Sequence, residues 1–451
     1  MPVDLVRKPI PVMPGAVPVL GHLPRYARDP LGFFTEMRDH ADVVRWRLGP
    51  TDNVFLSNPA HIERMFLENE RTFAMLDDPG YAFSLFAGQG IITTHGEFWR
   101  RQRKMMQPGV HPKRIAGYAA TMVDLTEQML REWQPGHTLD IRVELLALTQ
   151  RIAAKTLFGA DVTGDAAAVG RALDVASREI GAEFRGTTMF VPRQVPTPGR
   201  VRLKAAIGKV EQVLYRIIDE RRATSGADRP DDMLSMLLDA RDDDGRPMSD
   251  RQLRDETMTL YIAGHETTGN TLVWAYTALA RHHQALERLH AEVAAVLGDR
   301  LPTIEDYRAL PYTEAVVKET LRLYPVAWQF PVRAVEDVEL SGHLVRAGTT
   351  VWTSQWPVQR DPRWFDAPEE FRPERFLGEP AFPRYAWFPF GGGPHVCLGN
   401  RFALVEAVLV LAMVAQRFRL DIDPALDVPP QPLITLQPGR DVPARLIPVT
   451  A

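Results

Sequence analysis

One stretch of the 451-residue chain, residues 249–282, predicts a helix long enough to cross an entire domain. Ser249 followed by Gln252 is typical of a helix start, and no proline interrupts the pattern before Arg281, so the helix would extend roughly 50 Å at about 1.5 Å per residue. Apolar side chains surround both ends of this stretch, as in a buried helix, whereas its middle is polar. Because burying polar groups costs free energy unless they are hydrogen-bonded, the middle is a candidate site.

Small side chains follow one face of this middle section. Ala263, Thr267 and Thr271 are spaced at i, i+4 and i+8, so they share a face and leave room beside it. Glu266 and the threonines are among the polar groups of this section. A satisfied internal hydrogen-bond network is the alternative interpretation of the same residues.

Cys397 is the only cysteine of the chain, and it lies in a glycine-rich run, residues 390–399, just before a long apolar helix. A lone cysteine forms no intramolecular disulfide and no multi-thiolate zinc site, so a chemical role requires a partner that takes one sulfur, such as haem iron. The glycines allow close approach to a flat cofactor and leave backbone N–H groups to stabilise a thiolate. A small buried apolar role is the alternative.

Composition limits the class of protein. With 45% apolar residues, 24% charged residues and a formal net charge of −4, the chain is an ordinary globular protein with a large core. No linker or repeat divides it, which predicts a single domain over residues 1–451 with a proline-rich segment at 9–21 and no reductase domain. Neither a signal peptide nor an apolar run of about 18 residues is found, so we expect no membrane anchor and a cytoplasmic location.

Hydrophobic periodicity predicts mostly helices with a few short strands. The expected fold class is therefore mainly α with a minor β part. Helical patterns cover 121–133, 143–157, 202–222 and 404–418, and strand patterns cover 43–49, 53–56, 338–344, 349–352 and 433–436.

Five motifs in one order resemble those of the cytochrome P450 family, and they extend over nearly the whole chain. The most specific is Phe390-x-x-Gly393-x-x-x-Cys397-x-Gly399, which resembles the family's haem-binding signature. The resemblance implies the P450 fold, with haem b (iron protoporphyrin IX) between the long helix and the Cys397 loop with its following helix. The other motifs are Trp99-x-x-x-Arg103, residues 263–268 (AGHETT), Glu319-x-x-Arg322 and residues 373–376 (PERF).

The resemblance also assigns roles to residues. Cys397 would be the axial iron ligand, Thr267 and Glu266 would relay protons, and Ala263 and Gly264 would flank the oxygen pocket. Glu319, Arg322 and Arg375 would form a buried structural network, since breaking such a network leaves an unpaired charge. The haem propionates would meet Trp99, Arg103, Arg333 and His395, with His95 as a weaker candidate; His395 stands where many relatives have arginine.

Substrate contacts are expected from apolar segments at the family positions. These segments favour a hydrophobic molecule such as a terpenoid, a carotenoid or a fatty acid. The expected contacts are Phe83, Leu85, Phe86, Phe190, Val326, Ala327, Trp328 and Ile434.

Electrons must come from outside the chain. It contains no Gly-x-Gly-x-x-Gly dinucleotide fingerprint and no cysteine cluster for iron–sulfur, which implies separate ferredoxin and ferredoxin reductase partners. Residues 100–104 hold four cations, which we interpret as a docking surface for an acidic donor; a solvated helix face is the alternative. No wider basic field accompanies them, so nucleic-acid binding is not expected.

The predicted function is an O2-dependent haem-thiolate monooxygenase. A peroxide-driven peroxygenase, or another haem-thiolate enzyme without reductive oxygen activation, is the enzymatic alternative, although the Glu266–Thr267 pair argues against it. A haem-based ligand sensor is a remote alternative, because no signalling module is evident.

Overall fold

The computed structural model describes residues 8–68, 70–76, 80–160, 164, 166–224, 229–242 and 244–449. The α-helices are α1 Leu23–Arg28, α2 Pro30–His40, α3 Pro59–Leu67, α4 Tyr81–Ala87, α5 Gly96–Met106, α6 Pro112–Glu132, α7 Ile141–Phe158, α8 Ala166–Arg185, α9 Pro198–Ala223, α10 Met233–Asp239, α11 Asp250–Arg281, α12 His283–Leu297, α13 Pro311–Leu323, α14 Gln355–Val358 and α15 Asn400–Arg417. The strands are β1 Val43–Leu48, β2 Thr51–Leu56, β3 Phe73–Ala74, β4 Thr138–Asp140, β5 Phe330–Ala334, β6 Val338–Leu340, β7 His343–Val345, β8 Thr350–Thr353, β9 Phe418–Asp421, β10 Pro430–Pro432, β11 Leu436–Pro438 and β12 Pro443–Pro448.

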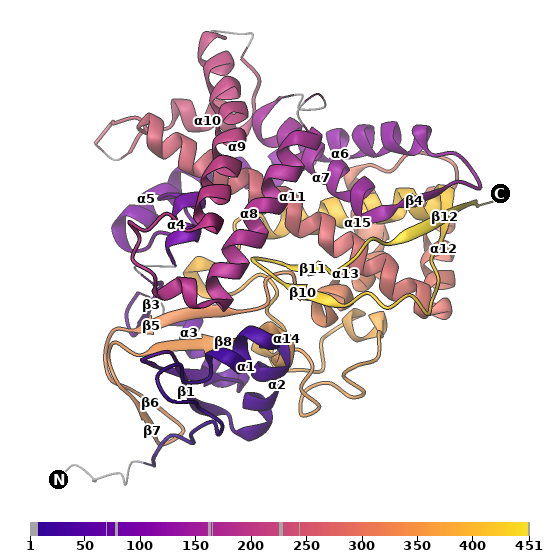
Figure 1. Cartoon of the computed structure of the whole chain (residues 1–451). Coiled ribbons are helices and arrows are strands. Elements are labelled where there is room, and N and C mark those ends of the chain that lie inside the picture. Colours follow the sequence, from indigo (N-terminus) through magenta and orange to yellow (C-terminus); the bar gives the residue numbers. More distant parts are fainter. Residues whose placement is uncertain are drawn as a thin grey trace.

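The long helix predicted from the sequence is α11, which has 32 residues. Its N-terminus is capped as expected, because the Ser249 side chain accepts a hydrogen bond from the Gln252 backbone N–H at 3.2 Å. Leu253 and Tyr261 belong to one hydrophobic core, formed with α4 and α7 to α10, whereas Leu272 and Trp274 belong to a second, formed with α6, α12, α13 and α15. The helix therefore joins the two main cores, and Figure 1 shows it running through the helical part of the molecule.

A small sheet occupies the side of the molecule where the N-terminus lies (Figure 1). Its strand order is β1-β2-β8-β5-β3, and only the β2–β8 pair is parallel, with Val54 opposite Val351. Helices α1 and α2 cover it with an aromatic cluster in which Phe34 stacks on Phe55 with ring centroids 5.2 Å apart. The predicted fold class, mainly α with a minor β part, is confirmed.

Two predicted strands differ in the structure. Residues 338–344 are not one strand but cover most of a hairpin in which β6 and β7 pair antiparallel, with Leu340 opposite His343. Residues 433–435 are not a strand but the bend between β10 and β11, which pair antiparallel with Pro432 opposite Leu436. The apolar run Leu433-Ile434 is typical of a strand. In the structure both residues lie at the tip of a hairpin, where tertiary contacts determine the backbone conformation. This tip becomes important for the site described next.

Candidate active site

The Cys397 loop lies between a short 3-10 turn, Gly393–His395, and helix α15. It is closed by the Cys397 backbone N–H, which donates to the Phe390 carbonyl oxygen at 2.9 Å. Gly393 has a φ of 60°, and a Cβ there would lie 2.0 Å from the Phe66 carbonyl oxygen. This glycine is therefore required for packing of the loop on α3, which fixes the position of the sulfur.

The Cys397 sulfur faces an internal space. The side chain is exposed to this space, yet it is deep enough in the fold that burial raises the pKa of the thiol. The Gly399 backbone N–H and the Arg103 guanidinium act in the opposite direction and lower that pKa, which favours a thiolate. A Cβ at Gly399 would meet no heavy atom of the described residues within 4 Å, so there is open space beside this glycine.

Three of the predicted propionate-binding residues lie together beside this loop. Trp99 of α5 and His395 stack with ring centroids 3.7 Å apart, and the Arg103 guanidinium lies 5.4 Å from the Trp99 ring centroid. Burial lowers the pKa of His395 to about 4, against the opposing pull of Glu70, so the imidazole is neutral at pH 7. Its Nε2 is buried 3.6 Å from a Glu70 carboxyl oxygen, and no group of the described residues lies at hydrogen-bond distance from it.

The other two candidates come from separate elements. Arg333 is half-buried on β5, in register with Thr350 of β8. His95 directly precedes α5 and lines a cavity of about 570 Å³ together with Phe98 and Arg193.

The middle of α11 combines an open face with a closed one. Ala263 is exposed although Tyr261 and His265 on either side of it are buried, and the Thr267 hydroxyl donates to the Ala263 carbonyl oxygen at 2.7 Å. Gly264 faces the other way: a Cβ there would lie 3.4 Å from side-chain atoms of α7. Ala263 and Thr267 thus border an internal space, whereas Gly264 serves the packing of α11 on α7.

Glu266 is 7% exposed and is held by the C-terminal hairpin rather than by its own helix. One carboxyl oxygen accepts two hydrogen bonds, one from the Gln437 side-chain amide at 2.6 Å and one from the Thr435 hydroxyl. Sequence reasoning missed Thr435 and Gln437, and no local pattern marks them, because they lie 169 and 171 residues along the chain from Glu266.

Glu319, Arg322 and Arg375 are brought together as the sequence suggested. Arg322 is fully buried and binds the equally buried Glu319 carboxylate with both Nε and Nη2, at 2.7 and 2.8 Å. Arg375 Nε approaches the same carboxylate at 3.4 Å. Backbone carbonyls of Gln359, Pro368 and Glu370 accept the remaining Arg322 hydrogens, so the network ties α13 to the segment that follows β8.

A second buried acid, Glu406 on α15, was not predicted. It is fully buried, and burial raises its pKa well above the usual range, with the Thr268 hydroxyl of α11 partly offsetting the effect. Glu406 is located where α15 meets α11, next to Thr268. A lone carboxylate within the apolar run 402–415 is a signal that could have found it.

The eight predicted substrate contacts do not form one group. Trp328 is 2% exposed in the aromatic core beside the sheet, and Phe190 packs its ring on Gly49 at the β1–β2 turn, so both have packing roles in this structure. Trp328 belongs to a core, whereas Phe190 is 44% exposed. Of the others, Phe86 and Val326 are buried, Phe83, Leu85 and Ile434 are half-buried, and Ala327 is exposed.

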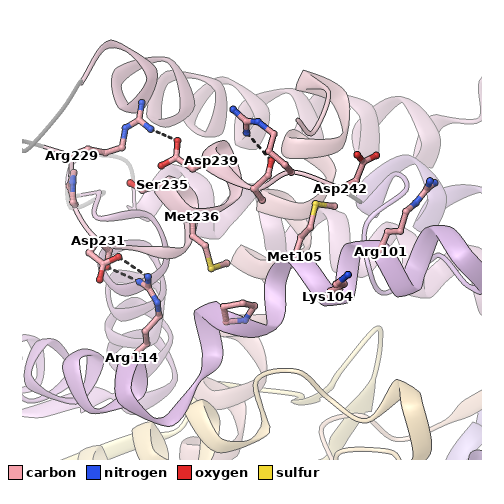
Figure 2. A pocket seen from close by; sticks show the side chains of 14 residues that line it. Arg101, Lys104, Met105, Arg114, Arg229, Asp231, Ser235, Met236, Asp239 and Asp242 are labelled. Atoms are coloured by element: carbon pink, nitrogen blue, oxygen red, sulfur yellow. Dashed lines mark hydrogen bonds and ion pairs between the residues drawn. The ribbon is translucent and has the colours of Figure 1, made fainter. Parts of the chain in front are cut away.

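The cations of α5 have divided roles. Arg103 points inward to Trp99, and Arg100 pairs with Glu70 at 3.0 Å, whereas Arg101 and Lys104 are exposed. Figure 2 shows Arg101 and Lys104 at the rim of a surface cavity of about 640 Å³. Its other lining residues include Met105, Pro108 and Met236 as well as the ion pairs Arg114–Asp231 and Arg229–Asp239, both at 2.7 Å.

These residues fit a flat anionic cofactor with one axial sulfur ligand. The donor set consists of one sulfur open to an internal space, a guanidinium, an indole N–H and a neutral imidazole with an unpartnered buried nitrogen. On α11, the open face at Ala263 and Thr267 offers a hydroxyl and little bulk. A haem meets these requirements: iron takes the sulfur, and the propionates take the hydrogen-bond donors and the cation.

A family model described as "Cytochrome P450" matches residues 11–441, and the chain belongs to the cytochrome P450 family. It is a cytochrome P450 monooxygenase, a haem enzyme. It is 36% identical to cyclooctat-9-en-7-ol 5-monooxygenase of Streptomyces melanosporofaciens, over 90% of this chain and 88% of that protein. Cyclooctatin synthase of the same organism is also 36% identical (97% and 95% covered), and pentalenene oxygenase of Streptomyces avermitilis is 34% identical (96% of both). Within the described residues, no helix combines the length and apolar character needed to span a membrane.

Proposed function

We propose that this P450 hydroxylates a terpenoid, using O2 and two electrons from separate redox partners. The observation that carries the reductive, O2-dependent chemistry is the Glu266–Thr267 pair on α11, with Thr267 one helical turn from the open Ala263 position, since an acid next to a hydroxyl there can supply protons to an otherwise apolar site. The terpenoid class is supported by the relatives named cyclooctatin synthase and pentalenene oxygenase.

The cofactor we propose is haem b, held by Cys397 through iron and by Trp99, Arg103 and His395 through the propionates, with Arg333 as a further partner. When bound, it supplies O2 activation at its iron. His395 would donate a hydrogen bond to a propionate. Arg103 would add the full positive charge of a guanidinium.

The chain's own residues control protons and water. Thr267 places a hydroxyl at the open face of α11, and Glu266, one residue before it, holds a carboxyl group for proton transfer to that hydroxyl. Apolar side chains on α4 and at the hairpin tip, such as Phe83 and Ile434, would exclude bulk water and contact the substrate. This division keeps protons available at one position without admitting solvent generally.

For electron delivery we propose an acidic ferredoxin that docks at the exposed cations of α5, Arg101 and Lys104. Both residues are exposed and lie at the rim of the cavity in Figure 2, while Arg103 on the inner side of the same helix reaches Trp99. The single-domain organisation and the cytoplasmic location stay as predictions.

The first experiment is the absorption spectrum of the purified protein reduced under carbon monoxide, followed by titration of the ferric form with terpenoids, carotenoid fragments and fatty acids. A strongly red-shifted Soret band establishes thiolate ligation, and displacement of iron-bound water by terpenoids alone supports the substrate class. Product formation that requires reduced pyridine nucleotide and redox partners supports the monooxygenase. Turnover with peroxide alone would instead favour the peroxygenase, and binding without turnover the sensor.

A further inference from the structure

Hydrogen bonds to other parts of the fold hold the C-terminal hairpin, residues 430–438, in place, in addition to its contacts with Glu266. The Trp274 indole N–H of α11 donates to the Leu436 carbonyl oxygen at 3.0 Å, and the Trp328 indole N–H donates to the Leu433 carbonyl oxygen at 3.1 Å. The Leu436 backbone N–H donates to the Val326 carbonyl oxygen at 2.9 Å. The hairpin is thus a fixed frame for the side chains it carries.

Two of those side chains converge on a single oxygen of Glu266. The Gln437 amide donates to this oxygen at 2.6 Å and is itself placed by the Ser177 hydroxyl of α8, 3.2 Å away. The Thr435 hydroxyl has one hydrogen, which it donates to Glu266, so it can only accept the weaker 3.5 Å bond from the Asn270 amide. Every member of this group is buried, which makes the bonds strong and their loss costly.

In this arrangement the two members of the acid–alcohol pair have different partners. The Glu266 carboxyl group is bound to the hairpin, whereas the Thr267 hydroxyl donates to the Ala263 carbonyl oxygen in its own helix. A carboxyl group fixed in this way must leave the hairpin bonds before it can reach the Thr267 hydroxyl.

We propose that Thr435 and Gln437 are positioning residues that hold Glu266 in a resting position at the C-terminal hairpin and thereby limit proton delivery to Thr267 when no substrate is bound. This inference rests on the proposed role of Glu266 as the proton-relay acid. Ile434, half-buried at the hairpin tip beside Thr435, is where a bound substrate would act on the same element.

The test uses the haem-loaded, substrate-free protein and the variants Thr435→Val and Gln437→Leu. Thr277→Val is the matched control, because Thr277 is equally buried on α11 and its hydroxyl donates to the Val273 carbonyl oxygen in its own helix. Loss of one hydrogen bond changes the ratio of molecules with Glu266 bound to the hairpin to molecules with Glu266 released by roughly threefold to tenfold. We therefore expect oxygen to reoxidise the chemically reduced Thr435→Val and Gln437→Leu proteins roughly threefold to tenfold faster than wild type, with the rate depending on H2O versus D2O.

A second readout does not depend on turnover. The infrared carboxyl band of Glu266, identified by its loss in Glu266→Gln, should shift in Thr435→Val and Gln437→Leu and stay in place in Thr277→Val. If both variants keep the wild-type band and reoxidation rate while Glu266→Gln is slower, the positioning role is wrong and the relay stands. If Glu266→Gln itself reoxidises like wild type, the relay role fails, and the inference fails with it.

Discussion

At the scale of single residues, the protonation state of each group in the haem site depends on its burial and on its charged neighbours. Cys397 is pushed toward the thiol by burial and toward the thiolate by the Gly399 N–H and by Arg103. His395 is kept neutral by burial despite Glu70 nearby. The iron ligand therefore relies on Arg103, a residue of another element, for part of its electrostatic support.

Replacing the ligand sulfur tests the first of these assignments. In Cys397→Ser we expect loss of the red-shifted Soret band of the reduced carbon monoxide complex, because a hydroxyl is a far weaker donor to iron than a thiolate. The spectrum and the haem content of the purified variant check this. A retained red-shifted band would show that another group ligates the iron.

Removing Arg322 tests the buried network. Arg322→Ala leaves the Glu319 carboxylate buried and uncompensated, which is expected to cost about 3–5 kcal/mol in the free energy of unfolding and to lower haem loading. Denaturant unfolding with haem content as a second readout measures it. Arg372→Ala, which breaks an exposed pair with Glu370, is the control and should cost about 0–1 kcal/mol. Equal costs in the two variants would contradict a structural role for the buried pair.

At the scale of elements, α11 also holds the loop that follows α4. The Asp255 carboxylate accepts the Gln89 backbone N–H at 2.8 Å, and the Glu256 carboxyl group accepts that of Ile91 at 2.9 Å. Gly88, the residue before Gln89, has a φ of 56°. A Cβ there would lie 2.2 Å from the Asp255 side chain. The loop is thus bound to the N-terminal half of the same helix whose middle forms the site.

This contact predicts a pH effect on stability. Burial, with a further contribution from Asp255, raises the pKa of Glu256 from 4.5 to about 8, so the folded protein keeps a proton that the unfolded chain releases above pH 4.5. Its stabilising contribution is complete below pH 4.5 and is lost as the pH rises to about 8.

We expect Glu256→Gln to unfold like wild type near pH 4.5 and to be more stable at pH 8, by on the order of 4 kcal/mol, since the amide oxygen still accepts the Ile91 N–H. Chemical denaturation across this pH range measures the difference. A stability difference that is constant with pH would show that Glu256 does not titrate in this window.

At the scale of the whole molecule, a formal net charge of −4 contrasts with the exposed cations of α5. An acidic donor would be attracted to these exposed cations, which gives orientation as well as rate. The cavity of Figure 2 lies on the same face as Arg101 and Lys104.

For the double variant Arg101→Glu and Lys104→Glu, we expect electron transfer from an acidic ferredoxin to slow about tenfold or more at low salt and to lose most of its salt dependence. Stopped-flow reduction at several ionic strengths is the measurement. Lys209→Glu, an exposed change on α9, is the control and should leave the rate near that of wild type. If the rate of reduction of the wild-type protein does not change with salt concentration, the proposed docking at α5 is wrong.

The sequence by itself determined the features that lie within one element or one short motif. The long helix with its polar middle, the glycine-rich loop of Cys397 and the Glu319–Arg322 pair all depend on spacing along the chain, which backbone geometry converts directly into shared faces and turns. Tertiary structure alone decided which distant groups meet: Thr435 and Gln437 on Glu266, His395 on Trp99, and the packing roles of Phe190 and Trp328. The physical reason is that an apolar or amide side chain satisfies many surroundings equally well, so its partner is set by how the helices and the hairpin pack and not by its neighbours in sequence.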